Sequence, residues 1–117
     1  MKTEPSINIP AIGNRLKELR KQSGLAQKYI AEYLGVDQSL IARYESGDRN
    51  MTTETLEKLA LLYGCTLNSI LTGESNHTVP AFSFRADGIE VEDLRALAEI
   101  NKIVLNQMLI DQLLAED

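Results

Sequence analysis

The sequence predicts an all-α protein in which five short helices are followed by one long helix. Apolar residues recur three or four positions apart in successive windows, as they do along the buried side of a helix. Glycines stand where this spacing breaks off, and glycine is the usual residue just past a helix end. We therefore expect an arm at residues 1–10, a compact domain at 11–73, a linker at 74–90 and a long C-terminal helix at 91–117.

The first helix is predicted to end at Gly24, where the chain must change direction. Its buried side is marked by four apolar residues at helical spacing: Ile9, Ile12, Leu16 and Leu19. This stripe gives the helix one face that must pack against the rest of the domain.

Two further short helices are predicted between Leu25 and Gly47, joined by a tight turn at Gly35. The turn position often requires a left-handed backbone, which glycine adopts without strain. Asp37 follows as the expected N-cap of the second of these helices, because its carboxylate can accept a bond from a free backbone N–H. The buried stripe of the first of them consists of Leu25, Ile30, Ala31 and Leu34.

The second helix of this pair has an unusual outward face. With Ile41 and Tyr44 pointing inward, helical geometry turns small and polar side chains away from the core. A solvated surface helix more often carries Glu and Lys, whereas small residues allow a close approach to the edges of DNA bases. The outward residues are Ser39, Ala42, Arg43 and Ser46, with Gln38 beside them in the first turn.

The fourth and fifth helices close the predicted domain. Thr52 or Thr53 begins the fourth, which Gly64 stops, and Thr66 caps the short fifth helix before Gly73. The lone cysteine, Cys65, stands in an apolar context and is expected to be a small core residue in a reducing compartment. The apolar residues of these helices are Leu56, Leu59, Ala60, Tyr63, Leu67, Ile70 and Leu71.

Several of these segments resemble one known family. IGNRLKELRKQSGLAQ, IAEYLGV, LIARYESGDRN and TLEKLALLYGCTLNSILTG are similar to successive parts of the lambda-repressor-like helix-turn-helix of phage repressors and Xre regulators. The resemblance extends from residue 12 to residue 73, which is 62 of the 117 residues. It implies a five-helix lambda-repressor-like DNA-binding domain, to which this chain adds a long C-terminal dimerisation helix.

The resemblance also implies roles for individual residues. Gln27 matches a position that holds a phosphate or a base, and Arg20 and Glu45 match a pair that forms an internal ion pair. Lys28 lies beside the motif, where it would neutralise a phosphate. The full set of predicted DNA-binding residues is Gln27, Lys28, Gln38, Ser39, Ala42, Arg43, Arg49 and Asn50.

Elementary recognition chemistry agrees with these roles. The amide of Gln38 matches the paired donor and acceptor of adenine, and Arg43 can form two bonds to guanine or one to a phosphate. Three positions depart from the family pattern. Ala26 replaces the usual Ser or Thr cap, Asp48 stands where a basic residue is usual, and Asp37 puts a carboxylate near the expected phosphates.

Charge is distributed unevenly along the chain. The net charge is −5, yet residues 1–73 carry nine Lys or Arg against eight Asp or Glu, and residues 74–117 carry three against nine. The acidic excess is therefore confined to the C-terminal segment. The nearly neutral domain predicts that DNA affinity depends on two copies acting together.

The C-terminal helix is predicted to have two apolar sides, and such a helix needs two partners. Its own domain would cover one side and a second copy of the chain the other, with packing inside one chain as the alternative. Asn101 is a polar residue within one of these apolar sides and would fix the register of the paired helices. The predicted dimerisation residues are Ile100, Ile103, Val104, Met108, Ile110 and Leu114. In the linker, Phe82 and Phe84 predict a short extended segment, with a disordered spacer as the alternative.

These observations predict a homodimeric repressor that binds double-stranded DNA at a palindromic operator. The alternative is an antitoxin-like or peptidase-regulated module whose tail binds a toxin or a metallopeptidase. An enzyme is not expected, because the chain holds one His and one Cys and no phosphate-binding loop. We expect no cofactor and no metal at His77, and we expect a cytoplasmic protein without signal peptide or membrane span.

Overall fold

The computed structural model describes residues 9–74 and 90–115 and confirms the all-α fold. Phe82, Phe84 and His77 lie outside these residues, so the predictions made for them stay predictions. The first helix begins at Ile9, two residues inside the predicted arm. The described residues form α1 (Ile9–Ser23), α2 (Gln27–Leu34), α3 (Gln38–Ser46), α4 (Thr53–Tyr63), α5 (Leu67–Thr72) and α6 (Val91–Ala115).

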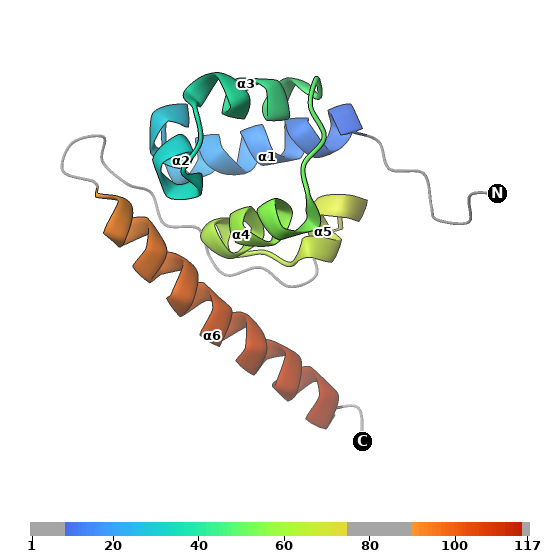
Figure 1. Ribbon diagram of the computed structural model, residues 1–117. Coiled ribbons are helices and arrows are strands. Elements are labelled where there is room, and N and C mark those ends of the chain that lie inside the picture. Colours follow the sequence, from blue (N-terminus) through green and yellow to red (C-terminus); the bar gives the residue numbers. More distant parts are fainter. Residues whose placement is uncertain (1–8, 75–89, 116–117) are drawn as a thin grey trace.

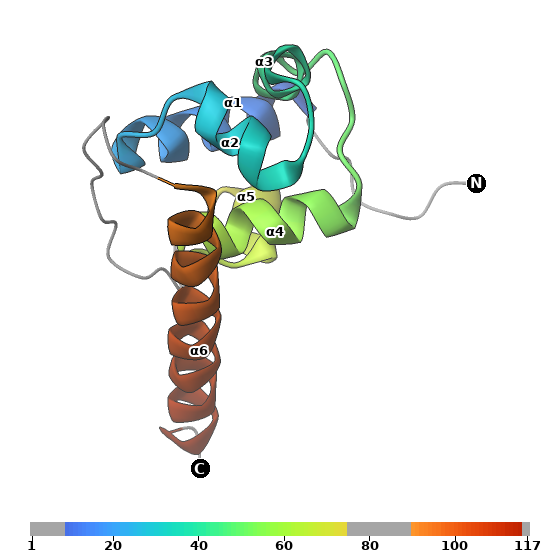
Figure 2. The ribbon, with the colours of Figure 1, turned by 60° about the vertical axis from the view of Figure 1, so that its left-hand side comes forward.

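The helices are stacked from α3 at one side of the molecule to α6 at the other (Figure 1). α3 lies on α1 and α2, while α1 also contacts α4 and α5. α6 packs on α4 and on α2, and its C-terminal half projects beyond the domain. In both views the C-terminal end of α6 points away from the side occupied by α3 (Figure 2).

One hydrophobic core joins all six helices, because each amphipathic stripe is buried against its neighbours. Leu94 of α6 is fully buried in this core, so the long helix is part of the domain at its N-terminal half. Cys65 is buried, as predicted, and this burial raises its pKa to about 11. The buried apolar residues include Ile12, Leu16, Leu25, Ile30, Ile41, Leu56, Leu59, Leu62 and Ile70.

The helix ends follow the predicted signals with one exception. Gly35 has φ 74°, and its N–H and that of Val36 both donate to the Ala31 carbonyl oxygen, at 2.8 and 2.9 Å. Thr52 and Thr66 cap α4 and α5 through their side-chain oxygens. Asp37 occupies the N-cap position of α3 but makes no capping hydrogen bond, so its predicted role as a cap is wrong.

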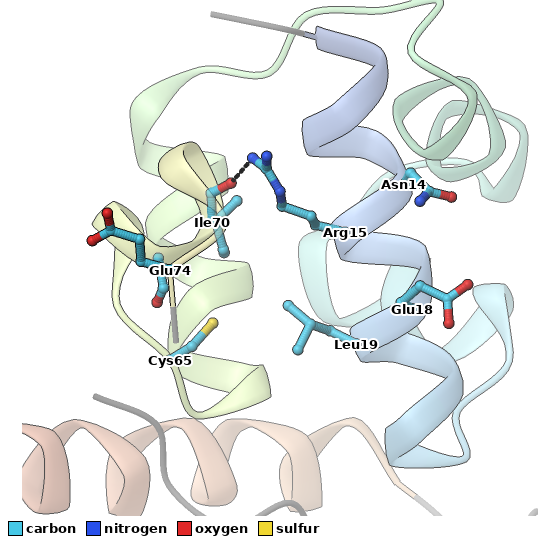
Figure 3. Close-up of a pocket in the computed structure, with 9 residues that line it drawn as sticks. Asn14, Arg15, Glu18, Leu19, Cys65, Ile70 and Glu74 are labelled. Carbon is cyan, nitrogen blue, oxygen red and sulfur yellow. Dashed lines mark hydrogen bonds between the residues drawn. The ribbon is translucent and has the colours of Figure 1, made fainter. Parts of the chain in front are cut away.

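Arg15 links α1 to the end of α5 (Figure 3). Its Nη1 donates to the carbonyl oxygens of Ile70 and Leu71, at 2.7 and 3.0 Å. These carbonyls belong to the last turn of a helix and have no partner within it. Arg15 therefore has a structural role, because it connects the first and fifth helices of the domain.

The two apolar sides of α6 are used differently. Leu94, Ala98 and Asn101 are buried against the domain. Asn101 Nδ2 donates to the carbonyl oxygens of Leu61 and Leu62 in α4, at 2.8 and 3.3 Å. Asn101 therefore fixes the position of α6 on its own domain, which corrects the expectation that it sets the register of a dimer.

The opposite side of α6 is uncovered. Every exposed large hydrophobic residue in the part of the chain that the structure describes lies on this helix. Four of them, Ile100, Ile103, Ile110 and Leu114, lie on this uncovered side, whereas Leu109 and Leu113 are exposed outside it at 100° per residue. Among residues 9–74 and 90–115, no helix combines the length and the apolarity needed to cross a membrane.

Candidate DNA-binding surface

The outer face of α3 is exposed, as the helical spacing predicts. Gln38, Ser39, Ala42 and Arg43 are all exposed, whereas Ile41 on the inner face is buried at 2% exposure. Because α1 lies beneath α3, this outer face points away from the remainder of the domain (Figure 1). The short side chains of Ser39 and Ala42 leave the helix backbone open to close approach.

A buried carboxylate holds α3 from below. Glu45 Oε2 accepts a hydrogen bond from Arg20 Nε at 2.7 Å, and Glu45 Oε1 accepts one from Arg20 Nη2 at 3.1 Å. Arg20 Nη1 also donates to the Leu25 carbonyl oxygen at 2.9 Å. The side chains of Arg20 and Glu45 are only 12% and 6% exposed. The ion pair predicted between α1 and α3 is therefore confirmed.

The electrostatics of this pair favour the charged form of Arg20. The hydrogen bonds to Glu45 raise the pKa of Arg20 despite the opposing effect of burial. Tyr63, whose pKa is raised mainly by burial, also lies within electrostatic range of both groups. A bidentate pair of this kind is stronger than a neutral hydrogen bond and defines the relative orientation of the two helices.

Gln27 joins the same network. Its Nε2 donates to Glu45 Oε1 at 3.0 Å, so the predicted DNA-binding residue at the start of α2 also connects α2 to α3. A glutamine amide carries two N–H groups, and the second remains available for another acceptor. The sequence did not reveal this link, because residues 27 and 45 lie 18 positions apart and neither shows a local pattern that pairs them.

The close approach of α1 to α3 depends on a glycine. A Cβ placed on Gly13 would lie 2.4 Å from the carbonyl oxygen of Tyr44 and 2.8 Å from that of Glu45. Atoms cannot approach so closely, and both partners are backbone atoms that cannot rotate away. Gly13 therefore allows α3 to lie directly on α1.

The remaining predicted DNA-binding residues lie around α3. Arg49 and Asn50 are exposed in the loop between α3 and α4, and Asp48 is exposed beside them. Lys28 is exposed on α2, with Nζ 5.1 Å from the centre of the Tyr29 ring. The side chains of Lys28, Asp48, Arg49 and Asn50 are thus accessible to solvent.

The six predicted dimerisation residues divide into two groups. Ile100, Ile103, Ile110 and Leu114 are between 48% and 67% exposed on the uncovered side of α6. Val104 and Met108 are half-buried and lie toward the side of the helix that carries Asn101. The apolar face of α6 that is accessible to a partner therefore includes only four of the six predicted residues.

A cavity of about 230 Å³ lies between α1 and α5, where Arg15 is already bonded to the Ile70 carbonyl oxygen (Figure 3). Within residues 9–74 and 90–115, no group of three His, Cys, Asp or Glu side chains is placed to hold a metal ion.

A short exposed helix of small and polar residues, set on a buried clamp and preceded by a glycine turn, defines a helix-turn-helix protein. Consistent with this class, the family model described as Helix-turn-helix matches residues 16–70. The chain belongs to the lambda-repressor-like, or Xre, family of helix-turn-helix transcriptional regulators.

Curated relatives support this assignment. The chain is 38% identical over 61 residues to the HTH-type transcriptional regulator ImmR of Bacillus subtilis, covering 52% of this chain and 48% of the relative. It is 41% identical over 61 residues to the B. subtilis regulator AnsR, covering 52% and 53%. It is 34% identical over 61 residues to control protein C.MunI of Mycoplasma sp, covering 51% and 82%.

The family model covers residues 16–70, which lie within the DNA-binding domain. The chain spans about half the length of the first two of these relatives. The comparison with solved structures gives no significant match. The family is therefore defined by the helix-turn-helix domain, and what the whole protein does follows as a proposal.

Proposed function

We propose that this protein is a dimeric repressor that binds an approximately palindromic operator. The observation that carries the proposal is the outer face of α3, where Gln38, Ser39, Ala42 and Arg43 are exposed above a rigid support. A helix of this kind fits the major groove, where each base pair presents a distinct pattern of donors and acceptors.

Each side chain on this face has a matching partner in DNA. Gln38 suits adenine, the methyl group of Ala42 suits thymine, and Arg43 suits guanine or a phosphate. Arg49, Asn50 and Lys28 lie at the edges of the face, where they would contact the sugar–phosphate backbone and position the protein without reading sequence.

Two copies are needed because a single domain carries little positive charge. A two-fold dimer presents two recognition helices to successive major grooves about 34–36 Å apart, which is why its operator is a palindrome. The exposed apolar side of α6 supplies a surface for such pairing. A dimer bound over a promoter would exclude polymerase by occupancy alone, and repression follows from this without any further activity.

The proposal is tested by identifying the operator and then measuring its affinity. Genomic pull-down with the full chain selects the DNA, and fluorescence anisotropy at fixed salt measures binding of the enriched sequence by the wild type and by Arg43→Ala. Loss of a base contact is expected to weaken specific binding roughly 5- to 150-fold, which corresponds to about 1–3 kcal/mol.

Arg95→Ala is the matched control, because Arg95 is an exposed arginine on α6 and is not among the residues proposed to contact DNA. Its affinity for the operator should equal that of the wild type. If no sequence is enriched, the function is wrong, and if Arg43→Ala binds as tightly as the control, Arg43 is not a DNA contact.

A second candidate function is favoured by the same apolar side of α6. Its four exposed large aliphatic residues could instead dock a different protein, such as a toxin or a peptidase, with DNA binding serving autoregulation. Sedimentation of the isolated chain separates the two. A stable dimer supports the repressor, whereas a monomer supports the protein-docking module.

A further inference from the structure

We propose that two copies pair through a parallel, two-stranded coiled coil of α6, with Gln107 fixing its register. This inference rests on the dimer of the proposed function and adds the orientation of the two chains and the residue that specifies it.

The uncovered side of α6 has the spacing of a coiled-coil seam. Its residues recur at alternating intervals of four and three, the heptad pattern in which two helices interlock along a narrow stripe. All are exposed, and four of them are large aliphatic residues. The seam consists of Ala96, Ile100, Ile103, Gln107, Ile110 and Leu114.

The seam and the domain occupy opposite sides of α6. Leu94, Ala98 and Asn101 face the domain and are buried, and Asn101 is bonded to the end of α4. Two helices can therefore meet along their seams while both domains stay outside the pair. The 25-residue helix is roughly 37 Å long at 1.5 Å per residue, so the seam covers five to six turns.

The direction of α6 relative to α3 selects the parallel arrangement. α3 lies at one side of the domain, its outer face pointing away from α1, and the C-terminal end of α6 points toward the other side (Figures 1 and 2). In a parallel pair the two-fold axis runs along the helices, so both α3 faces point the same way, toward one duplex. In an antiparallel pair the axis is perpendicular to the helices, and the two faces point in opposite directions.

Gln107 provides an independent argument for the same orientation. In a parallel coil each seam residue meets its own counterpart, so two Gln107 amides face each other, and each can donate to and accept from the other. In an antiparallel coil Gln107 would instead meet Ile103 or Ile110 of the second copy and lose its partners. A single polar seam residue is a known device for fixing register and strand number, at a cost in stability.

The residues beside the seam are compatible with a parallel pair. Asn106 and Asp111 flank it five positions apart, which places Asn106 of one copy beside Asp111 of the other. An amide beside a carboxylate is a favourable contact. Gln107 Nε2 already donates to Asp111 Oδ1 at 3.0 Å, and this exposed bond leaves one amide hydrogen free for the second copy.

Cysteine cross-linking of the full chain tests the orientation. In a parallel coil, Leu114→Cys brings two thiols together, and mild oxidation should convert most of the protein to a disulfide-linked dimer on a non-reducing gel. Gln112→Cys is the matched control, because residue 112 is exposed on the side of the helix away from the seam and should remain monomeric on that gel. The native Cys65 is buried and is common to both variants.

Sedimentation equilibrium separates the two levels of the proposal. A monomeric wild type overturns the dimer itself, whereas a dimeric wild type whose Leu114→Cys form does not cross-link overturns only the parallel arrangement. Gln107→Ile should tighten association at least tenfold and also allow species larger than a dimer. An unchanged dimer in Gln107→Ile would show that Gln107 does not specify the pairing.

Discussion

The helices α2 and α3 are held in the domain differently from α4 and α5. α4 and α5 begin with threonine caps, Thr52 and Thr66, and bury mainly apolar side chains. α2 and α3 begin without any side-chain capping bond, and a buried charged pair and a close backbone contact hold α3 in place.

The two pairs of helices also differ in their proposed roles, because α2 and α3 carry the surface that we propose for DNA, whereas α4 and α5 do not. No side-chain cap covers the first turns of α2 and α3, which lie near the surface that we propose for DNA, and helix N-termini are natural sites for phosphate. Glu45 compensates for the stability lost at these helix ends, because it accepts hydrogen bonds from α1 and α2. The surface proposed for DNA includes no residue of α4 or α5, and these two helices keep their threonine caps.

The largest effect is expected from removing the carboxylate under α3. Glu45→Ala leaves the Arg20 guanidinium without its partner in a nearly buried position and should lower the free energy of unfolding by about 3–5 kcal/mol. Urea denaturation measures this loss. Glu57→Ala, at an exposed acidic position in α4, is the control and should change stability by less than about 0.5 kcal/mol. Equal stability of the two variants would contradict a supporting role for Glu45.

An intermediate effect is expected at the contact between α1 and α3. Gly13→Ala improves helix propensity, but the added methyl group overlaps backbone atoms of α3, so a net loss of about 1–3 kcal/mol is expected. Thermal unfolding by circular dichroism reports it. Asn14→Ala, at the neighbouring exposed position, should unfold near the wild-type temperature. A Gly13→Ala variant as stable as Asn14→Ala would show that the two helices can separate at little cost.

The smallest effect concerns the caps themselves. Thr66→Ala removes the bond from the Ser69 N–H, which is 3.0 Å long, and should cost about 1 kcal/mol. Asp37→Ala removes no capping bond and should change stability by less than about 0.5 kcal/mol. Chemical denaturation of both variants under the same conditions compares the two helix starts. An equal loss in the two variants would mean that Asp37 caps α3 in solution.

Sequence reasoning was most successful where a property is local. Helical spacing and glycine positions predict all six helices, because both depend on residues within one or two turns. Thr52 and Thr66 were recognised for the same reason. The pairing of Arg20 with Glu45 is not local and came from the family resemblance, and the structure confirms it.

Several contacts that sequence reasoning missed join distant parts of the chain. Arg15 bonds carbonyls 55 and 56 positions away, and Asn101 bonds carbonyls 40 and 39 positions away. Backbone carbonyls carry no residue-specific signature, so nothing in the sequence identifies these acceptors. A polar residue inside an apolar stripe did give a signal at Asn101, because buried polar groups require partners. That signal could not distinguish the chain's own domain from a second copy.

The bond from Arg15 also affects how the domain opens. α5 has six residues, too few for a helix to persist alone in water. Two of its last carbonyl oxygens are bonded to a side chain of α1, and Ile70 is buried at 1% exposure. Amide hydrogen exchange in α5 should therefore proceed by global unfolding and not by local fraying, and this short C-terminal element of the domain should be as protected as its central helices.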